Sequence, residues 1–206
     1  MIPSKKTLAK LKVEVYLNGV RLFRDACSLF KARSHASAFA LAILTLEELG
    51  KLEMVDHICD DISINPDSNP KEFLDHLFSR QMFFNHKNKQ MWASDPIFNF
   101  KKKRLTDIDE GVLDRAKQDA LYVGYSKRRV RSPRTITATK AYSELSVVYR
   151  RFTDIGDLGF NGFDCCSDSR SKARARKWFA MIDKEYRSLK KPYPLKGHSS
   201  PRVTTA

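Results

Sequence analysis

The fold of this chain is decided by AFALAILTLEELGK, residues 38–51. Ala, Leu, Ile and Phe fill almost every position up to residue 46, and two glutamates and a lysine follow within five residues. Gly and Pro are scarce before residue 60, and apolar residues recur at helical spacing. Because a helix that is apolar all round is buried all round, residues 34–59 are predicted to form one long helix at the centre of the protein.

Five further segments show the same helical spacing of apolar residues. These predicted helices cover residues 8–30, 70–92, 108–123, 138–152 and 169–189. Turn-forming residues occupy 65–70, and residues 93–108 and 154–168 are expected to be irregular. The sequence has no repeat and no strand-rich region, so the predicted fold class is all-α, a helical bundle with additional C-terminal helices.

Three parts are expected along the chain. The helical bundle covers residues 1–155, and residues 156–190 form a loop and a basic helix packed on that bundle. Residues 191–206 are rich in small polar residues and are predicted to be a disordered tail.

The composition favours a polyanionic partner. The chain has 206 residues, 42% of them hydrophobic, which is enough for a sizeable packed core. Its formal net charge of +14 and its sequence pI near 9.7 favour nucleic acid or an anionic membrane surface as a partner. The alternative is a protein that is merely basic.

A cytoplasmic protein without a membrane segment is expected. No apolar stretch reaches the roughly 20 residues that a membrane span needs, and early lysines interrupt any signal-peptide core. The four cysteines form no CxxC pair and are expected to be reduced thiols. The sequence also lacks a Walker motif, a GxGxxG motif and any Glu-x-x-His pair, so neither a cofactor nor a metal is predicted.

Charged residues follow directly after the most apolar part of the central helix. Glu47 and Lys51 are four residues apart and share a helix face, so they could form an ordinary ion pair contributing about 0.2–0.5 kcal/mol. The helical pattern nevertheless continues through Leu52 and Val55. In the second interpretation, Glu47 and Glu48 therefore belong to a polar network that holds an active-site arginine or lysine.

An arginine and a histidine lie close together on the helix predicted over residues 70–92. Arg80 and His86 are six residues apart, which places them about 120° apart around a helix axis, near enough to point into one cleft. Histidine can move the proton of a ribose 2′-hydroxyl and arginine can hold the phosphate, so the pair would suffice to cut RNA without a metal. An ordinary surface histidine is the alternative, because chance gives about one such spacing in a chain of this composition.

Basic segments at residues 101–104 and 127–134 could follow an RNA backbone. Tyr122, Tyr125 and Trp92 could stack on bases. For any one of these residues, a solvated loop or a core aromatic is the simpler interpretation.

The residues around these sites resemble those of AbiV-type abortive infection proteins, within the HEPN superfamily. The resemblance rests on the run at 38–51, on Asn18, Asp25 and Ala26 before it, and on residues 86–89 and 120–123 after it. HEPN proteins are helical bundles that commonly dimerise, and many are metal-independent ribonucleases in which an arginine precedes a histidine by this spacing. The resemblance therefore implies a HEPN-like bundle with Arg80 and His86 as its catalytic pair.

The same resemblance implies roles for further residues. Glu47 and Lys51 match a Glu-x-x-x-Lys motif of some HEPN toxins and would orient the catalytic pair. Gln81 departs from the small polar residue that often follows the arginine. The residues predicted to contact RNA are Glu48, Lys87, Lys89, Tyr122, Lys127, Arg128 and Arg129.

The function predicted from the sequence is antiphage defence by abortive infection. The protein would be a homodimeric, metal-independent endoribonuclease toxin that stops translation when a phage protein triggers it. The alternative is a non-catalytic module that binds RNA or a phage protein and blocks translation by occupancy.

Overall fold

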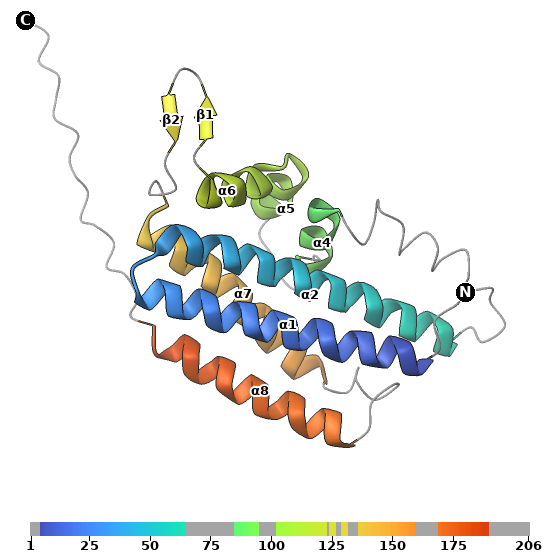
Figure 1. Ribbon diagram of the computed structural model, residues 1–206. Helices are drawn as coiled ribbons and strands as arrows, with labels where there is room; N and C mark the ends of the chain where they lie inside the picture. The colour runs from blue at the N-terminus through green and yellow to red at the C-terminus, as the bar shows by residue number, and fades with distance from the viewer. Residues whose placement is uncertain are drawn as a thin grey trace, which may run out of the picture.

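The structure of the protein is a computed structural model that describes residues 5–64, 85–94, 102–122, 124–126, 129–131, 136–159 and 169–189. Within these ranges the chain is helical, apart from turns and one short hairpin (Figure 1). The predicted all-α fold class is therefore confirmed. None of the described helices is long and apolar enough to cross a lipid bilayer.

The first two helices form an antiparallel pair. They are α1 (Lys5–Lys31) and α2 (His35–Ile64), as the sequence predicted for residues 8–30 and 34–59. Arg33 closes the turn between them in the left-handed region, at φ 62°. The Arg33 amide donates to the Phe30 carbonyl (N–O 3.0 Å), and the Ser34 amide donates to the Leu29 carbonyl (N–O 2.9 Å). This Schellman geometry satisfies carbonyls that the end of α1 would leave unpaired.

Arg33→Gly is expected to stabilise the protein by about 0.5–1 kcal/mol. A residue with a Cβ atom pays about 1–2 kcal/mol to adopt the left-handed region, and glycine avoids this strain. Glycine also makes the unfolded chain more flexible, which cancels part of the gain in stability. Chemical denaturation measures the change. Arg24→Gly is the matched control, because Arg24 is exposed within α1, where the same replacement should cost up to about 1 kcal/mol. A loss of stability in Arg33→Gly would contradict the expectation.

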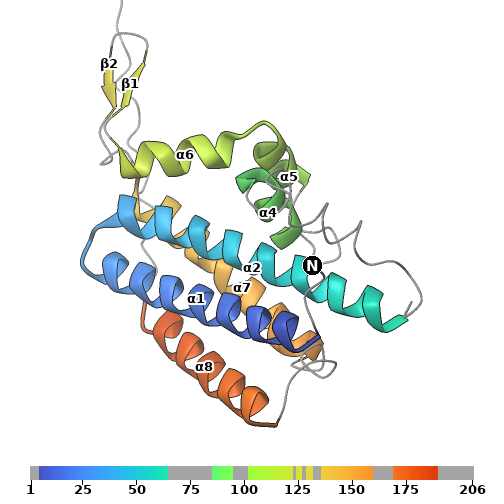
Figure 2. The same ribbon diagram turned by 45° about the vertical axis from the view of Figure 1, so that its right-hand side comes forward.

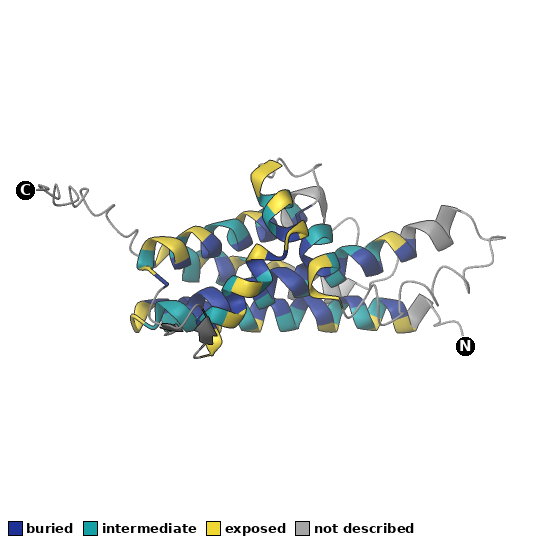
Figure 3. Ribbon diagram, turned by 90° about the horizontal axis from the view of Figure 1, so that it is seen from above, coloured by how far each residue is buried: buried dark blue, intermediate teal, exposed yellow. Residues whose placement is uncertain are grey.

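Helix α2 is the central element, as predicted. Helices α1 and α7 (Ala138–Gly159) pack against part of its surface, and α4 (His86–Ala93) and α6 (Val112–Leu121) pack against another part (Figures 1 and 2). The short helix α5 (Lys102–Asp109) contacts α4 and α6. Buried residues gather where the helices face one another, and exposed residues lie on their outer sides (Figure 3).

Aromatic side chains join the helices of the bundle. Phe152 of α7 makes edge-on contacts with Phe23 and Tyr16 of α1, with ring centroids 5.6 and 5.9 Å apart. The C-terminal helix α8 (Ser169–Arg187) packs against α1 and α7. Tyr186 of α8 stacks on Tyr149 of α7 with ring centroids 4.0 Å apart, so this basic helix is joined to the bundle by its aromatic face.

A two-stranded hairpin follows α6. Strand β1 (Gly124–Ser126) pairs antiparallel with β2 (Arg129–Arg131), and the hairpin projects from the helices in Figure 1. Strand β2 lies within the basic segment at 127–134 and β1 directly precedes it, and no strand was expected in either place.

The helix predicted over residues 70–92 is not continuous. Asn85 has an extended backbone (φ −74°, ψ 122°) and caps α4, its side chain accepting hydrogen bonds from the Lys87 and Asn88 amides. Such side-chain bonds compete with the helix interior and start a new helix. The 120° angle expected between Arg80 and His86 assumed one helix and does not apply. Arg80 lies outside the described residues, as does the whole of the predicted loop at 65–70.

Two further boundaries differ from the sequence prediction. Residues 102–109 form α5 although they were expected to be irregular, and α6 begins after Gly111, not at residue 108. Gly111 has φ 68°, a conformation that glycine adopts without strain, and it separates the two helices. Helix α7 also continues to Gly159, into the expected loop, because Ile155 still packs in the core. The predicted tail at 191–206 lies outside the described residues.

Candidate functional site

The site is built around Glu47, a carboxylate in the middle of α2. Its side chain is only 2% exposed. One oxygen, Oε1, accepts hydrogen bonds from Gln90 Nε2 (2.8 Å) and Lys117 Nζ (2.7 Å). The other, Oε2, lies 2.6 Å from His86 Nδ1. Since a buried carboxylate is costly unless it is paired, these partners explain how an acid is tolerated in the apolar helix.

Helix α4 supplies two of those partners from one face. His86 and Gln90 are four residues apart, so both point towards α2 from successive turns. The two helices touch backbone to backbone at Gly50, where an added Cβ would lie 1.8 Å from the Lys89 carbonyl oxygen. Gly50 therefore brings α4 near enough for His86 and Gln90 to reach Glu47.

His86 is placed to transfer protons. Its Nδ1 lies against Glu47 Oε2, while the side chain as a whole is 48% exposed. A carboxylate is only an acceptor, so we assign the proton to Nδ1, which leaves the Nε2 lone pair free in the neutral ring. Glu47 thus fixes both the orientation and the tautomer of a half-exposed imidazole, as a carboxylate does for a general base.

Helix α6 supplies a cation and a second acid. Lys117 is 2% exposed, and its Nζ lies 2.7 Å from Glu47 Oε1 and 2.9 Å from Asp114 Oδ1. Sequence reasoning missed both residues, and it missed Gln90. A signal was present, because Leu113, Lys117 and Ala120 are the buried residues of α6 and follow one helical stripe. A lysine inside an apolar stripe needs a buried acid just as Glu47 needs a cation.

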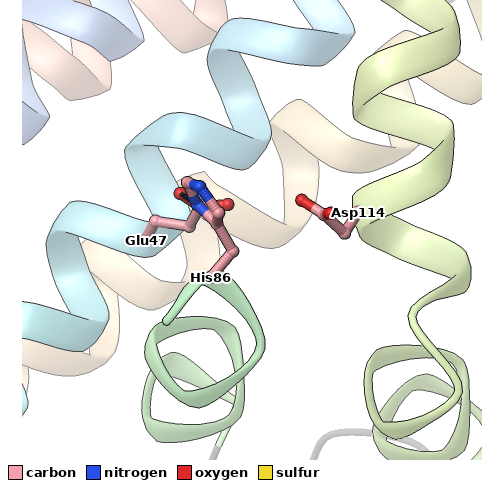
Figure 4. Close-up of side chains that lie close together, drawn as sticks. All are labelled: Glu47, His86 and Asp114. Carbon is pink, nitrogen blue, oxygen red and sulfur yellow. Dashed lines mark hydrogen bonds and ion pairs between the residues drawn. The ribbon is translucent and has the colours of Figure 1, made fainter. Parts of the chain in front are cut away.

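Three of these side chains could together ligate a metal ion. Glu47, His86 and Asp114 each offer one ligand atom, and those atoms all lie within 4.8 Å of one another. Figure 4 shows them converging from α2, α4 and α6. This is the one such group found among the described residues, and the sequence did not predict it.

Lys89 is buried beside the same carboxylate. Its side chain is 7% exposed, with Nζ 3.7 Å from Glu47 Oε2. Burial lowers the pKa of Lys89, an effect that the nearby Glu47 carboxylate only partly opposes. The ammonium faces the protein interior, and contact of Lys89 with RNA remains a prediction.

Lys89→Met is expected to raise the free energy of unfolding near pH 7, and the gain should shrink as the pH rises towards 10. Between its lowered folded-state pKa and the ordinary lysine value of about 10.4, the unfolded chain binds more protons than the folded chain. The free energy of unfolding of the wild type therefore rises with pH across this window, because Lys89 loses its buried charge. Methionine does not titrate, so it contributes no such pH dependence. Urea unfolding of both proteins across the window measures the difference. Lys10→Met, at an exposed position of α1, is the control. A gain that is constant with pH would contradict the expectation.

The remaining predicted site residues are placed as follows. Lys51 forms an ion pair with Glu48, three residues before it. Lys87 Nζ donates to the Asp109 carbonyl (2.8 Å), which ties α4 to the end of α5.

Tyr122 is 63% exposed just after α6. Arg129 belongs to β2, and Arg80, Lys127 and Arg128 lie outside the described residues. The structure thus brings Glu47, His86 and Lys89 together.

Comparison with models of known protein families identifies the family of this chain. Residues 7–153 match a HEPN family, so the helical fold described above is of the HEPN type. The matching family is HEPN_AbiV, described as AbiV, and the chain belongs to it. The resemblance seen in the sequence is confirmed, and the chain is an abortive-infection protein of the HEPN type. No curated protein and no solved structure matches it.

Proposed function

We propose that this AbiV-family protein is a metal-independent endoribonuclease toxin that stops translation during phage infection. The observation that carries the proposal is the hydrogen bond between Glu47 Oε2 and His86 Nδ1, 2.6 Å long, with half of the imidazole exposed. A buried acid that orients an accessible histidine is an arrangement for proton transfer. The net charge of +14 suits a polyanionic substrate.

The reaction follows from the free nitrogen of His86. Nε2 takes the proton of a ribose 2′-hydroxyl, and the 2′-oxygen attacks the adjacent phosphorus. The bond to the 5′-oxygen breaks, and that oxygen leaves with a proton from an imidazolium. The products are a 2′,3′-cyclic phosphate and a 5′-hydroxyl. Glu47 keeps the ring in place and balances its charge while it holds the proton.

The other roles in the proposal come from the family resemblance and from the basic and aromatic residues of the sequence. Arg80 holds the scissile phosphate, Lys51 supports the site, and two copies bring their sites together across a two-fold axis. Glu48, Lys87, Lys89, Tyr122, Lys127, Arg128 and Arg129 guide the RNA. A phage protein is the trigger, because an uninfected cell must survive the protein's presence.

An RNA cleavage assay in EDTA tests the proposal. Purified wild type and His86→Ala are incubated with total cellular RNA, with and without a nuclease-cleared lysate of phage-infected cells. We expect cleavage by wild type alone, with cyclic phosphate ends, and dependence on the lysate would show triggering. Intact RNA in every lane, with both proteins folded and both protective in cells, would instead favour a module that blocks translation by binding.

A further inference from the structure

We infer that Lys117 is the built-in cation of this site: its ammonium occupies the position among Glu47, His86 and Asp114 that a divalent metal ion would take. Lys117 Nζ lies 2.7 Å from Glu47 Oε1, 2.9 Å from Asp114 Oδ1 and 3.2 Å from His86 Nδ1. The three atoms it contacts belong to the three residues whose ligand atoms lie within 4.8 Å of one another. A metal ion and this ammonium cannot both be present.

The charges around this position call for a cation. Glu47 is buried in the bundle, and Asp114 adds a second carboxylate three residues before Lys117 on α6. An ammonium carries one charge and three donors, so it can face both carboxylates at once, while the Nδ1–H of His86 points to Glu47 Oε2. Without Lys117, the carboxylates of Glu47 and Asp114 and the imidazole of His86 would converge with only Lys89 Nζ, 3.7 Å from Glu47 Oε2, as a nearby cation. Two carboxylates and an imidazole are a ligand set that first-row metals bind.

The lysine side chain keeps this cation in place. Lys117 is 2% exposed on a helix whose neighbouring residues Leu113 and Ala120 are also buried. A charge attached to α6 cannot dissociate, and a chelator cannot remove it. Lys117 is therefore a positioning residue that fixes the carboxylate holding His86. This inference is independent of whether the site cuts RNA.

Metal titration tests the inference, with Co²⁺ as the probe. Wild type and Lys117→Ala are titrated with CoCl2 by calorimetry, and visible absorption reports ligation by nitrogen and oxygen. Lys117→Ala should bind Co²⁺ stoichiometrically and at least about tenfold more tightly than wild type. Adding Asp114→Asn should remove that gain. Co²⁺ should also raise the Tm of Lys117→Ala but not that of wild type.

Lys12→Ala is the matched control. Lys12 is as buried as Lys117 and forms an ion pair with Asp56, but it is not among three clustered ligands. Its loss should lower stability without creating a Co²⁺ site. If Lys117→Ala folds poorly without metal, Lys117→Gln keeps a donor for Glu47 and is titrated in parallel.

Three results of the Co²⁺ titrations would contradict the inference. Tight Co²⁺ binding by wild type that Asp114→Asn abolishes would overturn the inference, since the position would then be open to a metal. Folded Lys117 variants that bind no better than wild type would overturn it too, as would variants that stay unfolded even with Co²⁺. Loss of RNA cleavage plays no part in this readout, so the inference can stand if the ribonuclease proposal fails.

Discussion

Replacing Gly50 with alanine is expected to displace α4 and to take His86 away from Glu47. The new Cβ would lie 1.8 Å from the Lys89 carbonyl oxygen and 2.7 Å from its carbonyl carbon, so the helix backbone itself has to move. Overpacking that shifts the backbone typically costs about 1–3 kcal/mol, and a contact this short places Gly50→Ala at the upper end of that range. The loss should exceed what the better helix propensity of alanine, about 1 kcal/mol, restores. Urea unfolding measures the change, and RNA cleavage in EDTA reports on the site.

Gly19→Ala is the matched control for Gly50→Ala. Gly19 also lies within a long helix, but an added Cβ there would meet its nearest neighbours at 3.6–3.7 Å, which is ordinary contact. Alanine at this position should therefore stabilise the protein by about 0.5–1 kcal/mol and leave the site unchanged. Equal losses in the two variants would mean that glycine is needed for a reason other than the approach of α4.

His86→Ala is expected to reduce RNA cleavage by at least about 100-fold while leaving the fold intact. Loss of a positioned proton-transfer group typically costs 10²–10⁴-fold. The fold should survive, because Glu47 keeps Gln90 and Lys117 as partners and the His86 side chain is half exposed. Initial cleavage rates, protection of cells from phage and the Tm are measured on the same preparations.

His57→Ala controls for the loss of a histidine as such. His57 is exposed on α2 and packs edge-on against Trp92, with ring centroids 5.5 Å apart. Cleavage and protection should persist in this variant. If His86→Ala is folded and still cleaves RNA at the wild-type rate, proton transfer by His86 is refuted. If wild type does not cleave RNA and both histidine variants protect cells, binding without catalysis becomes the better account.

Local patterns in the sequence were enough to predict most helices. The apolar run at 38–46 predicted a central helix, because only burial on all sides accommodates such a face, and α2 is that helix. The positions where one helix ends and the next begins were harder to predict, since they depend on single residues. Asn85 caps a helix through two backbone amides, and Gly111 turns the chain at positive φ, whereas the apolar spacing around them still reads as helical.

For the site, the sequence left two interpretations of Glu47 open, and the structure distinguishes them. Glu47 lies in a buried network with His86, Gln90 and Lys117, as the second interpretation required. Lys51 forms the short-range ion pair of the first interpretation, but with Glu48. The first interpretation therefore named the wrong acid and spacing for the Lys51 ion pair, because Glu48 and Glu47 are adjacent on the helix and face different surroundings.

The sequence by itself determined that Glu47 and Glu48 interrupt an apolar helix and that His86 lies in a later helical segment. It also determined that the chain is strongly basic. Only the tertiary structure decided which side chains pair with Glu47. Lys117 lies 70 positions further along the chain and His86 lies 39 positions further. Helix periodicity relates residues three or four apart, whereas a buried charge finds its partner through the packing of α4 and α6 on α2, which no local spacing encodes.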